Sequence, residues 1–324
     1  MLSHNKFRLA LAYVRKMTDE KGMIEHAKYN EPNKTEGYTT DDNARAFQAA
    51  LRVGGELAPE RKIYLRFLQR AVAKEGFHND MDAMGKWVDA AGVGEWYGRA
   101  MAAVAEGVIK GEAEEKRICR EIFEKAKPGM VGVDHLRTAA QLVIAGEAQM
   151  ADKLVTAFEK NREADWMWFE SGLYHDNGRL PMAMFVAYGK TGRKKYLQIG
   201  KESLDFWLKV TFKTEKGYFM WPGTAGWWRK GEEWAEFDQQ PIEAGSTVEV
   251  CVTAYEATGD VKYREYAEKA WEWYEGRNVM GLSLIDEQTG GIRDGLHRDR
   301  CNLNEGAEAV LSFILAGISL SKLS

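Results

Sequence analysis

Apolar residues recur at helical spacing along most of the chain. In the stretch DQQPIEAGSTVEVCVTAYEATG, a polar group is followed by Pro241, and apolar residues then recur through Val248 and Tyr255 until a Thr-Gly pair. Proline is tolerated in the first turn of a helix, and Thr-Gly is a typical helix stop. The stretch therefore predicts a buried helix with polar chemistry at its N-terminal end.

Two segments of the chain match each other at a fixed offset. AYGKTGRKKYLQIGKESLDFW begins at Ala187, and AYEATGDVKYREYAEKAWEWY begins at Ala254. In each segment one helical pattern ends at Thr-Gly and the next pattern begins. A repeat of this kind is typical of stacked helix pairs.

The same periodicity and stop signals predict about twelve helices. They span roughly residues 3–17, 42–53, 60–74, 94–110, 112–126, 134–146, 148–161, 179–190, 193–209, 242–257, 260–275 and 303–320. Every second helix, such as GAEAVLSFILAGISL, is rich in Ala, Gly and apolar residues and should be buried on most sides. The others, such as KYREYAEKAWEWYEG, carry one apolar stripe and a charged face. We therefore expect inner and outer helices to alternate.

The connections between these helices alternate in length. Joins from an inner to an outer helix are short, as in GKTGRK, whereas most joins from an outer to an inner helix are long, glycine-rich and aromatic. Loops much longer than is usual between helices commonly carry function. We expect the long loops to emerge on one face, and several to contain short β-ribbons.

Six helical hairpins with this alternation resemble the (α/α)6 toroid of the six-hairpin glycosidase superfamily. The segments GYTTDDNARA, YHDNGRLP, DQQPIEA and DGLHRDRCNLNEGAEA also resemble uncharacterised helical modules associated with glycosyltransferases and mannoside-active enzymes. The resemblance covers nearly the whole chain and implies an all-α fold with a single catalytic domain over residues 1–324. The superfamily includes glycoside hydrolases, polysaccharide lyases and N-acylglucosamine 2-epimerase-like enzymes, so the resemblance implies carbohydrate chemistry without selecting a reaction.

Composition narrows the class of partner. The 45 basic and 49 acidic residues give a formal net charge of −4, which offers no electrostatic basis for binding nucleic acid or an anionic membrane. The 3 cysteines are widely spaced and predict neither a disulfide framework nor a zinc site. Since the sequence has no secretion signal and no membrane-spanning apolar run, we expect a soluble cytoplasmic protein. The 11 tryptophans indicate either a large core or faces that stack on flat ligands.

Acids, amides and arginines gather at the predicted N-termini of the inner helices. TTDDNAR, GEWYGR, YHDNGR, DQQPIE and NLNEGAE each combine several such residues, whereas a helix N-cap needs only one. In a toroid these ends converge, and carboxylates, amides and aromatic faces are the groups that hold sugars. The candidate substrate-binding residues are Asp41, Asn43, Arg45, Trp96, Arg99, Trp168, Tyr174, His175, Arg179, Trp221, Trp228, Asp238, Gln240, Asp294, His297, Asn304 and Glu305.

Glycoside hydrolysis requires a pair of carboxyl groups. Asp42 and Asp176 are the favoured candidates, because each lies beside an amide and three positions before an arginine, where a helix dipole stabilises a carboxylate. Glu95, Glu243 and Asp294 compete for the role of the acid, which needs a raised pKa. The favoured function is hydrolysis of a soluble intracellular oligosaccharide or glycoside, with no cofactor and no metal ion.

Two other functions stay open. His175 and His297 both fall in long loops, and an imidazole with a pKa near neutrality suits the proton transfers of a sugar 2-epimerase or isomerase. The other alternative is a non-catalytic helical module that binds a glycan or a glycosyltransferase. Nucleotide-binding and serine-hydrolase motifs are absent from the sequence.

Overall fold

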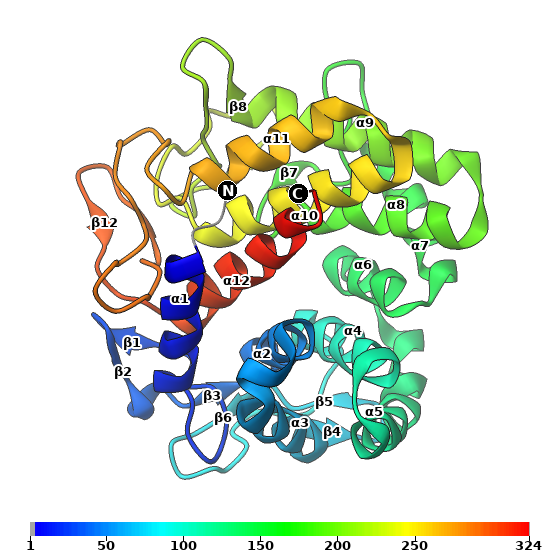
Figure 1. Ribbon diagram of the computed structural model, residues 1–324. Coiled ribbons are helices and arrows are strands. Elements are labelled where there is room, and N and C mark those ends of the chain that lie inside the picture. The colour runs from blue at the N-terminus through cyan, green and yellow to red at the C-terminus, as the bar shows by residue number, and fades with distance from the viewer. Residues whose placement is uncertain (1–3, 324) are drawn as a thin grey trace.

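The computed structural model describes residues 4–323 and is built from paired α-helices (Figure 1). Within these residues six helices form an inner ring: α2 (Thr40–Val53), α4 (Glu95–Lys110), α6 (Leu136–Ala145), α8 (Arg179–Thr191), α10 (Pro241–Thr258) and α12 (Ala307–Ser321). Each inner helix packs on the next, and α12 packs on α2. The ring is therefore closed.

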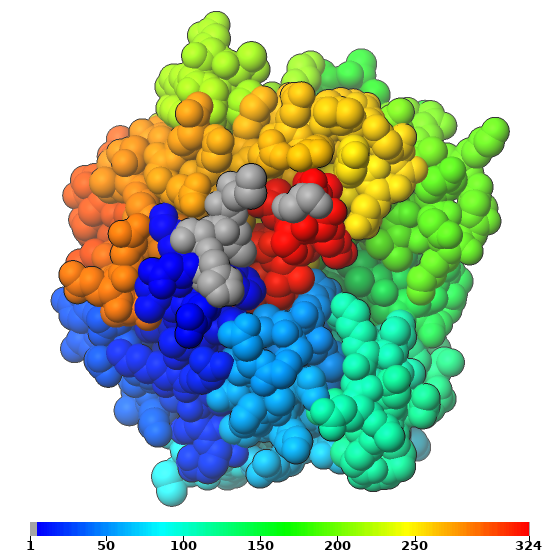
Figure 2. Space-filling view, viewed as in Figure 1, coloured from blue at the N-terminus to red at the C-terminus, as the bar shows by residue number. Residues whose placement is uncertain are grey.

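An outer helix covers each inner helix. The outer helices are α1 (His4–Lys16), α3 (Ala58–Ala71), α5 (Ala113–Ala126), α7 (Ala151–Asn161), α9 (Lys194–Thr211) and α11 (Val261–Glu272). Helix α1 packs on α12, and each later outer helix packs on the inner helix directly before it in the chain. The colours of Figure 2 follow the ring in chain order and bring the first and last helices side by side. The predicted all-α (α/α)6 toroid is confirmed.

The burial of the two helix types follows from their sequence patterns. In α10 every residue from Pro241 to Val252 is buried, because most of the side chains around the helix are small or apolar; Glu243 and Glu249 are the charged exceptions. In α11 the buried residues are Tyr263, Ala267, Ala270 and Trp271, which form one stripe at helical spacing. Continuous apolar character thus places a helix inside the ring, and a single stripe places it outside.

The predicted helix ranges agree with the observed ones to within about four residues at each end. The largest difference is at α12, which begins at Ala307 because Cys301–Asn302 (β12) pairs with Gly295–Leu296 (β11) before the helix starts. Helix α3 ends at Ala71, earlier than predicted, because Val72–Ala73 (β4) pairs with Gly76–Phe77 (β5). Ser3, the predicted start of the first helix, lies outside the described residues.

The long connections contain short antiparallel β-ribbons, as predicted. The remaining pairs are β1 (Ala27–Lys28) with β2 (Glu31–Pro32), β3 (Tyr38–Thr39) with β6 (Asp80–Met81), β7 (Gly172–Leu173) with β10 (Trp228–Arg229), and β8 (Phe212–Lys213) with β9 (Tyr218–Phe219). The 3-10 helices are η1 (Lys34–Glu36), η2 (Gly54–Leu57), η3 (Lys127–Gly132) and η4 (Ala148–Met150). The β3–β6 and β7–β10 pairs join strands from different connections and so tie neighbouring loops together. Across residues 4–323, no helix is both long and apolar enough to cross a membrane.

Several tryptophans form a core beneath the loops. Trp168 and Trp221 are fully buried, and both stack on Trp207, with ring centroids 6.0 and 5.8 Å apart respectively. The prediction that Trp168 and Trp221 line a sugar-binding groove is therefore wrong, because neither ring reaches the surface. Aromatic side chains are needed here to fill the space under long loops that have little regular structure.

Candidate functional site

The N-terminal ends of the inner helices lie together at one end of the ring, which we call the mouth; the opposite end, formed by their C-termini, is the rear. Two arginines join four of the inner helices at the mouth. Arg45 on α2 bonds to Glu308 in the first turn of α12, and Arg99 on α4 bonds to Asp176 just before α8. The structure thus gathers helix starts that are distant in the sequence.

Arg45 is the centre of the first group of contacts. Its Nη1 atom donates to Asp41 Oδ2 at 2.7 Å and to Asp42 Oδ1 at 3.0 Å, and its Nη2 atom donates to Glu308 Oε2 at 2.8 Å. The side chain is buried, and so is that of Asp42. One guanidinium group therefore holds three carboxyl groups from two helices.

Arg99 is the centre of the second group. Its Nη1 atom donates to Asp176 Oδ2 at 2.8 Å, its Nε atom lies 2.5 Å from Asp41 Oδ1, and its Nη2 atom lies 3.4 Å from Glu95 Oε2. Asp41 thus has one oxygen on each arginine. Asp41 therefore links the contacts around Arg45 to those around Arg99.

A further chain of ion pairs leads from Asp176 into the ring. Arg179 Nε donates to Asp176 Oδ1 at 3.2 Å, and Arg179 Nη2 lies 2.5 Å from Glu249 Oε2. The other oxygen of Glu249 accepts a hydrogen bond from Arg52 Nη1 at 3.2 Å. Glu249 is buried on α10, so its two arginine partners compensate for the loss of water.

Glu243 holds the turn that precedes α8. Its carboxylate accepts hydrogen bonds from the backbone N–H of Asp176 at 2.6 Å and from that of Asn177 at 3.2 Å. Burial raises the pKa of Glu243 to about 7.

Asp176 is buried and has a φ of 51°. The guanidinium groups of Arg179 and Arg99 hold the pKa of Asp176 well below the usual range despite this burial. Both carboxyl groups lie beneath the surface, and their catalytic role stays a prediction.

Asp41 and Asp42 are adjacent residues whose pKa values shift in opposite directions. Burial raises the pKa of Asp42 to about 7, although the charge of Arg45 opposes this shift. Burial acts on Asp41 in the same direction, but Arg45 and Arg99 together bring its pKa below the ordinary value. Near neutral pH, Asp41 is therefore ionised and Asp42 retains its proton for much of the time.

Four half-buried side chains carry the solvent-accessible polar groups of this network. Asp41 is 24 % exposed, Glu95 30 %, His175 28 % and Glu308 31 %. His175 Nε2 lies 3.7 Å from Glu308 Oε2, and the His175 carbonyl accepts a hydrogen bond from Arg137 of α6. A ligand at the mouth would meet these groups first.

Asn43 does not have its predicted role. Its Oδ1 atom accepts a hydrogen bond from the Met23 N–H at 2.9 Å, and its Nδ2 atom donates to the Thr39 carbonyl at 2.8 Å. The side chain is fully buried. The prediction that Asn43 binds substrate is wrong, because its polar atoms are used to fix the connection between α1 and α2.

The other predicted residues lie around the mouth in separate groups. Their contacts are His297 Nδ1 with Asp238 Oδ1, the Gly306 N–H with Asp294 Oδ1, Thr289 Oγ1 with Glu305 Oε2, the Tyr29 N–H with Asn304 Oδ1, Trp96 Nε1 with the Phe77 carbonyl, Trp228 Nε1 with the Glu232 carbonyl, and the Tyr174 N–H with Asn177 Oδ1. Gln240 is the N-cap residue of α10. Burial raises the pKa of Asp294 to about 6 and that of Glu305 to about 7. Substrate binding by these residues stays a prediction.

Sequence reasoning missed Glu308, Glu249 and Arg137. Glu308 looked like a mid-helix residue because the helix was predicted to start at 303; the true start at Ala307 places it in the first turn. Glu249 could have been found, since a charged residue on a helix that is otherwise buried on all sides needs a buried partner. Arg137 follows a connection with no aromatic loop, and no local signal marks it.

Comparisons with known proteins agree on the fold. No protein-family profile matches the chain, and a search of curated proteins gave no relative. Solved structures that resemble it include a D-mannose isomerase (TM-score 0.71, 12 % identity, 99 % of each chain covered). A cellobiose 2-epimerase from Bacillus thermoamylovorans has a TM-score of 0.72 and 15 % identity over 97 % of this chain and 98 % of that one. An α-mannanase of glycoside hydrolase family 76 from Bacteroides thetaiotaomicron has a TM-score of 0.66 and 10 % identity over 99 % and 96 %.

At these identities the likeness shows a shared architecture. The resemblance to the six-hairpin glycosidase superfamily is therefore confirmed at the level of the fold. The similar structures include isomerases and epimerases as well as a hydrolase, so the reaction has to be argued from the residues of this chain.

Proposed function

We propose that this protein is a carbohydrate-active enzyme that hydrolyses glycosides with Asp41 and Asp42. The observation that supports the proposal most directly is the contact of both carboxyl groups with Arg45 Nη1, at 2.7 and 3.0 Å, combined with pKa shifts in opposite directions. Two neighbouring carboxyl groups with separated pKa values are what acid and nucleophile roles require.

The environment of each carboxyl group assigns its role in the proposal. Asp41 is ionised, half-buried and held by Arg45 and Arg99, which suits a nucleophile that attacks the anomeric carbon. Asp42 keeps its proton near neutral pH and donates it to the departing glycosidic oxygen. This differs from the pair favoured from the sequence, because Arg179 and Arg99 lower the pKa of Asp176, so that Asp176 does not hold the proton that an acid must donate.

The short separation of the two groups favours retention of configuration. Retaining glycosidases hold their carboxyl groups about 5 to 5.5 Å apart, whereas inverting enzymes need about 6.5 to 9.5 Å to admit a water molecule. Two carboxylate oxygens that bond to the same nitrogen atom at 2.7 and 3.0 Å lie close together, which favours the shorter class. We infer a covalent glycosyl intermediate on Asp41 that water then hydrolyses.

The fold supports a carbohydrate as the substrate. Similar structures include a mannose isomerase and an α-mannanase, and the segment GYTTDDNARA, which contains both aspartates, is part of the resemblance to mannoside-active enzymes. Soluble mannose-containing oligosaccharides are therefore the first substrates to test. The predicted association with a glycosyltransferase stays a prediction.

One NMR experiment tests the proposed reaction. The wild-type protein is incubated in D2O with aryl mannosides, aryl glucosides and the corresponding oligosaccharides, and the anomeric signals are followed from the first minutes. We expect release of the aglycone with a first product of retained configuration. An inverted first product would contradict the close-pair mechanism, and the absence of cleavage across the panel would contradict hydrolysis.

Sugar epimerisation is the second candidate, because two imidazoles at the mouth each have a carboxylate partner. His297 Nδ1 contacts Asp238, and His175 Nε2 lies 3.7 Å from Glu308. A carboxylate on one ring nitrogen leaves the other nitrogen free to act as a base. Deuterium entering C2 of a free sugar in the same NMR experiment would favour this reaction. Binding without either change would favour the non-catalytic module.

A further inference from the structure

Backbone strain is concentrated at the mouth. Among residues 4–323, the non-glycine residues with positive φ are Tyr29 (54°), Asp176 (51°) and Trp227 (58°). All three lie in connections that lead from an outer to an inner helix. Such conformations are costly for residues with a side chain and persist where the surrounding structure enforces them, often at functional sites. Asp176 already belongs to the network described above, whereas Tyr29 has no assigned role.

Tyr29 occupies a turn position that favours glycine. The strands β1 and β2 pair Lys28 with Glu31, so Tyr29 and Asn30 form a two-residue hairpin loop. A positive φ at the first loop residue is typical of a type II′ turn, where glycine avoids the steric penalty. The fold alone would therefore be served better by glycine at this position.

The backbone of Tyr29 is fixed on both sides, while its ring is left free. The Tyr29 N–H donates to Asn304 Oδ1 at 2.9 Å, and the Tyr29 carbonyl accepts from the Glu305 N–H at 3.0 Å. These bonds attach the hairpin to the segment that leads into α12 and to Glu308. Tyr29 is 58 % exposed, which is unusual for a large aromatic residue held so firmly.

A suitable polar group lies beside this aromatic residue. The Oδ1 atom of Asn304 is occupied by Tyr29, so the orientation of the amide is set. In the described part of the chain, no hydrogen bond uses Asn304 Nδ2. An exposed aromatic ring next to an oriented amide donor is a combination that binds a pyranose, whose apolar face stacks and whose hydroxyl groups accept hydrogen bonds.

We propose that Tyr29 and Asn304 form an outer sugar subsite at the rim of the mouth. This subsite binds a distal pyranose unit of an oligosaccharide that extends from the Asp41 and Asp42 pair. The proposal rests on the proposed function for its choice of ligand. It adds that the enzyme prefers oligosaccharides to single sugars. This preference would come from Tyr29, a residue with strained backbone and a largely exposed position.

The test compares binding with stability in Tyr29→Gly, Tyr29→Phe and a matched control. Val261 has the same 58 % exposure but begins α11 at the rear, so Val261→Ala is the control. Dissociation constants for manno-oligosaccharides and for mannose are measured by calorimetry, and melting temperatures by thermal unfolding. We expect Tyr29→Gly to weaken oligosaccharide binding about tenfold while its melting temperature stays equal or rises. Tyr29→Phe keeps the ring and should bind within about twofold of the wild type, as should Val261→Ala.

The possible results separate this subsite from the proposed reaction. Unchanged oligosaccharide binding by Tyr29→Gly overturns the subsite, whatever its melting temperature and even if the wild type hydrolyses glycosides. Weaker binding by Tyr29→Gly supports the subsite even if the wild type shows no turnover, in which case only hydrolysis is lost. Failure of the wild type to bind any oligosaccharide of the panel overturns both.

Discussion

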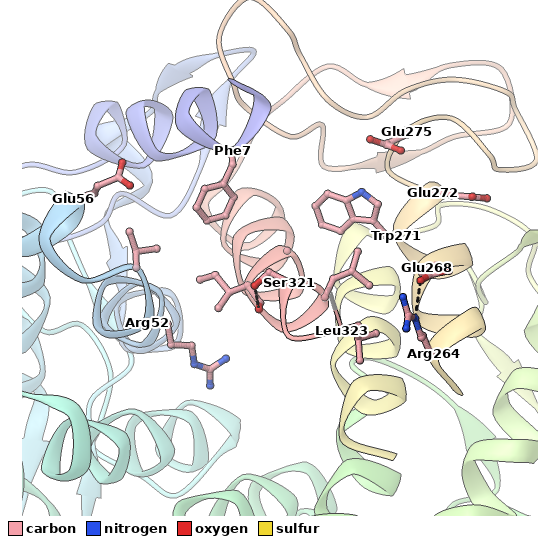
Figure 3. Close-up of a pocket in the computed structure, with 14 residues that line it drawn as sticks. Phe7, Arg52, Glu56, Arg264, Glu268, Trp271, Glu272, Glu275, Ser321 and Leu323 are labelled. Carbon is pink, nitrogen blue, oxygen red and sulfur yellow. Dashed lines mark hydrogen bonds and ion pairs between the residues drawn. The ribbon is translucent and has the colours of Figure 1, made fainter. Parts of the chain in front are cut away.

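The mouth and the rear of the ring differ in how far their charged groups are exposed. At the rear, a groove of about 880 Å³ runs between α1 and α11 over the end of α12, with Phe7 and Trp271 on opposite sides (Figure 3). One ion pair along the groove, Arg264 with Glu268, is 44 % and 51 % exposed. Arg52 also lines the groove and is 19 % exposed, because it pairs with Glu106 deeper in the ring. At the mouth, Arg45 and Asp42 are only 6 % and 7 % exposed.

This difference in burial is the reason why we expect chemistry at the mouth rather than in the rear groove. Exposed ion pairs are screened by water and contribute little, whereas a buried guanidinium among carboxylates changes which of them carry a proton. The mouth also has the positive ends of the inner helices, the long connections and the strained backbone. Function is therefore expected where buried charge is concentrated.

The largest expected effect comes from Asp41→Asn at the mouth. The amide keeps the shape of the side chain but removes the nucleophile, so kcat for glycoside hydrolysis should fall about 10³- to 10⁴-fold. Initial rates with aryl glycosides measure this loss, and thermal unfolding checks that the variant is folded. Activity close to that of the wild type would remove Asp41 from the mechanism.

Asp42→Asn should have a smaller effect that depends on the leaving group. An unmodified oligosaccharide needs a proton on its departing oxygen, so its hydrolysis should slow about 10²- to 10³-fold. The leaving group of a dinitrophenyl glycoside departs without being protonated, so hydrolysis of this substrate should slow clearly less. Equal losses for both substrates would show that Asp42 is not the acid.

The pH dependence of kcat/KM should reflect the opposite pKa shifts of these two groups. Asp42 must be protonated, so kcat/KM should fall about tenfold per pH unit above a pKa of about 7. Asp41 must be ionised, and because its pKa is lowered, the acidic limb should lie below the ordinary aspartate range. Rates between pH 3 and 9 test both limbs, and a profile that rises through pH 7 would contradict the assignment of the acid.

The smallest effect is expected at the rear. Arg264→Ala removes an exposed ion pair and should change the free energy of unfolding by less than about 0.5 kcal/mol. Hydrolysis rates should stay within about twofold of the wild type, because the residue lies far from the inner-helix N-termini. Denaturant unfolding and initial rates measure both quantities. A large loss of turnover would mean that the rear takes part in function, and the contrast between the two ends would fail.

Many residues of the site could be predicted from the sequence, but their burial and their contacts with one another could not. The spacing in TTDDNAR and YHDNGR identified Asp41, Asp42, Arg45, Asp176 and Arg179 as a polar group at helix starts. It did not show that Asp176 is buried, or that Glu308 reaches Arg45 from the other end of the chain. The tryptophans were ambiguous for the same reason, since composition does not distinguish a ring stacked in the core from one on a binding surface.

The sequence by itself determined the local structure: helical periodicity, proline and glycine signals and alternating loop lengths defined the helices and their inner or outer place. Those signals act over a few residues, so they can be read without the fold. Only the tertiary structure decided which of several equivalent acids lie beside which arginine. Proton affinity and exposure depend on charges and packing from segments hundreds of residues apart, as the contact between Arg45 and Glu308 shows.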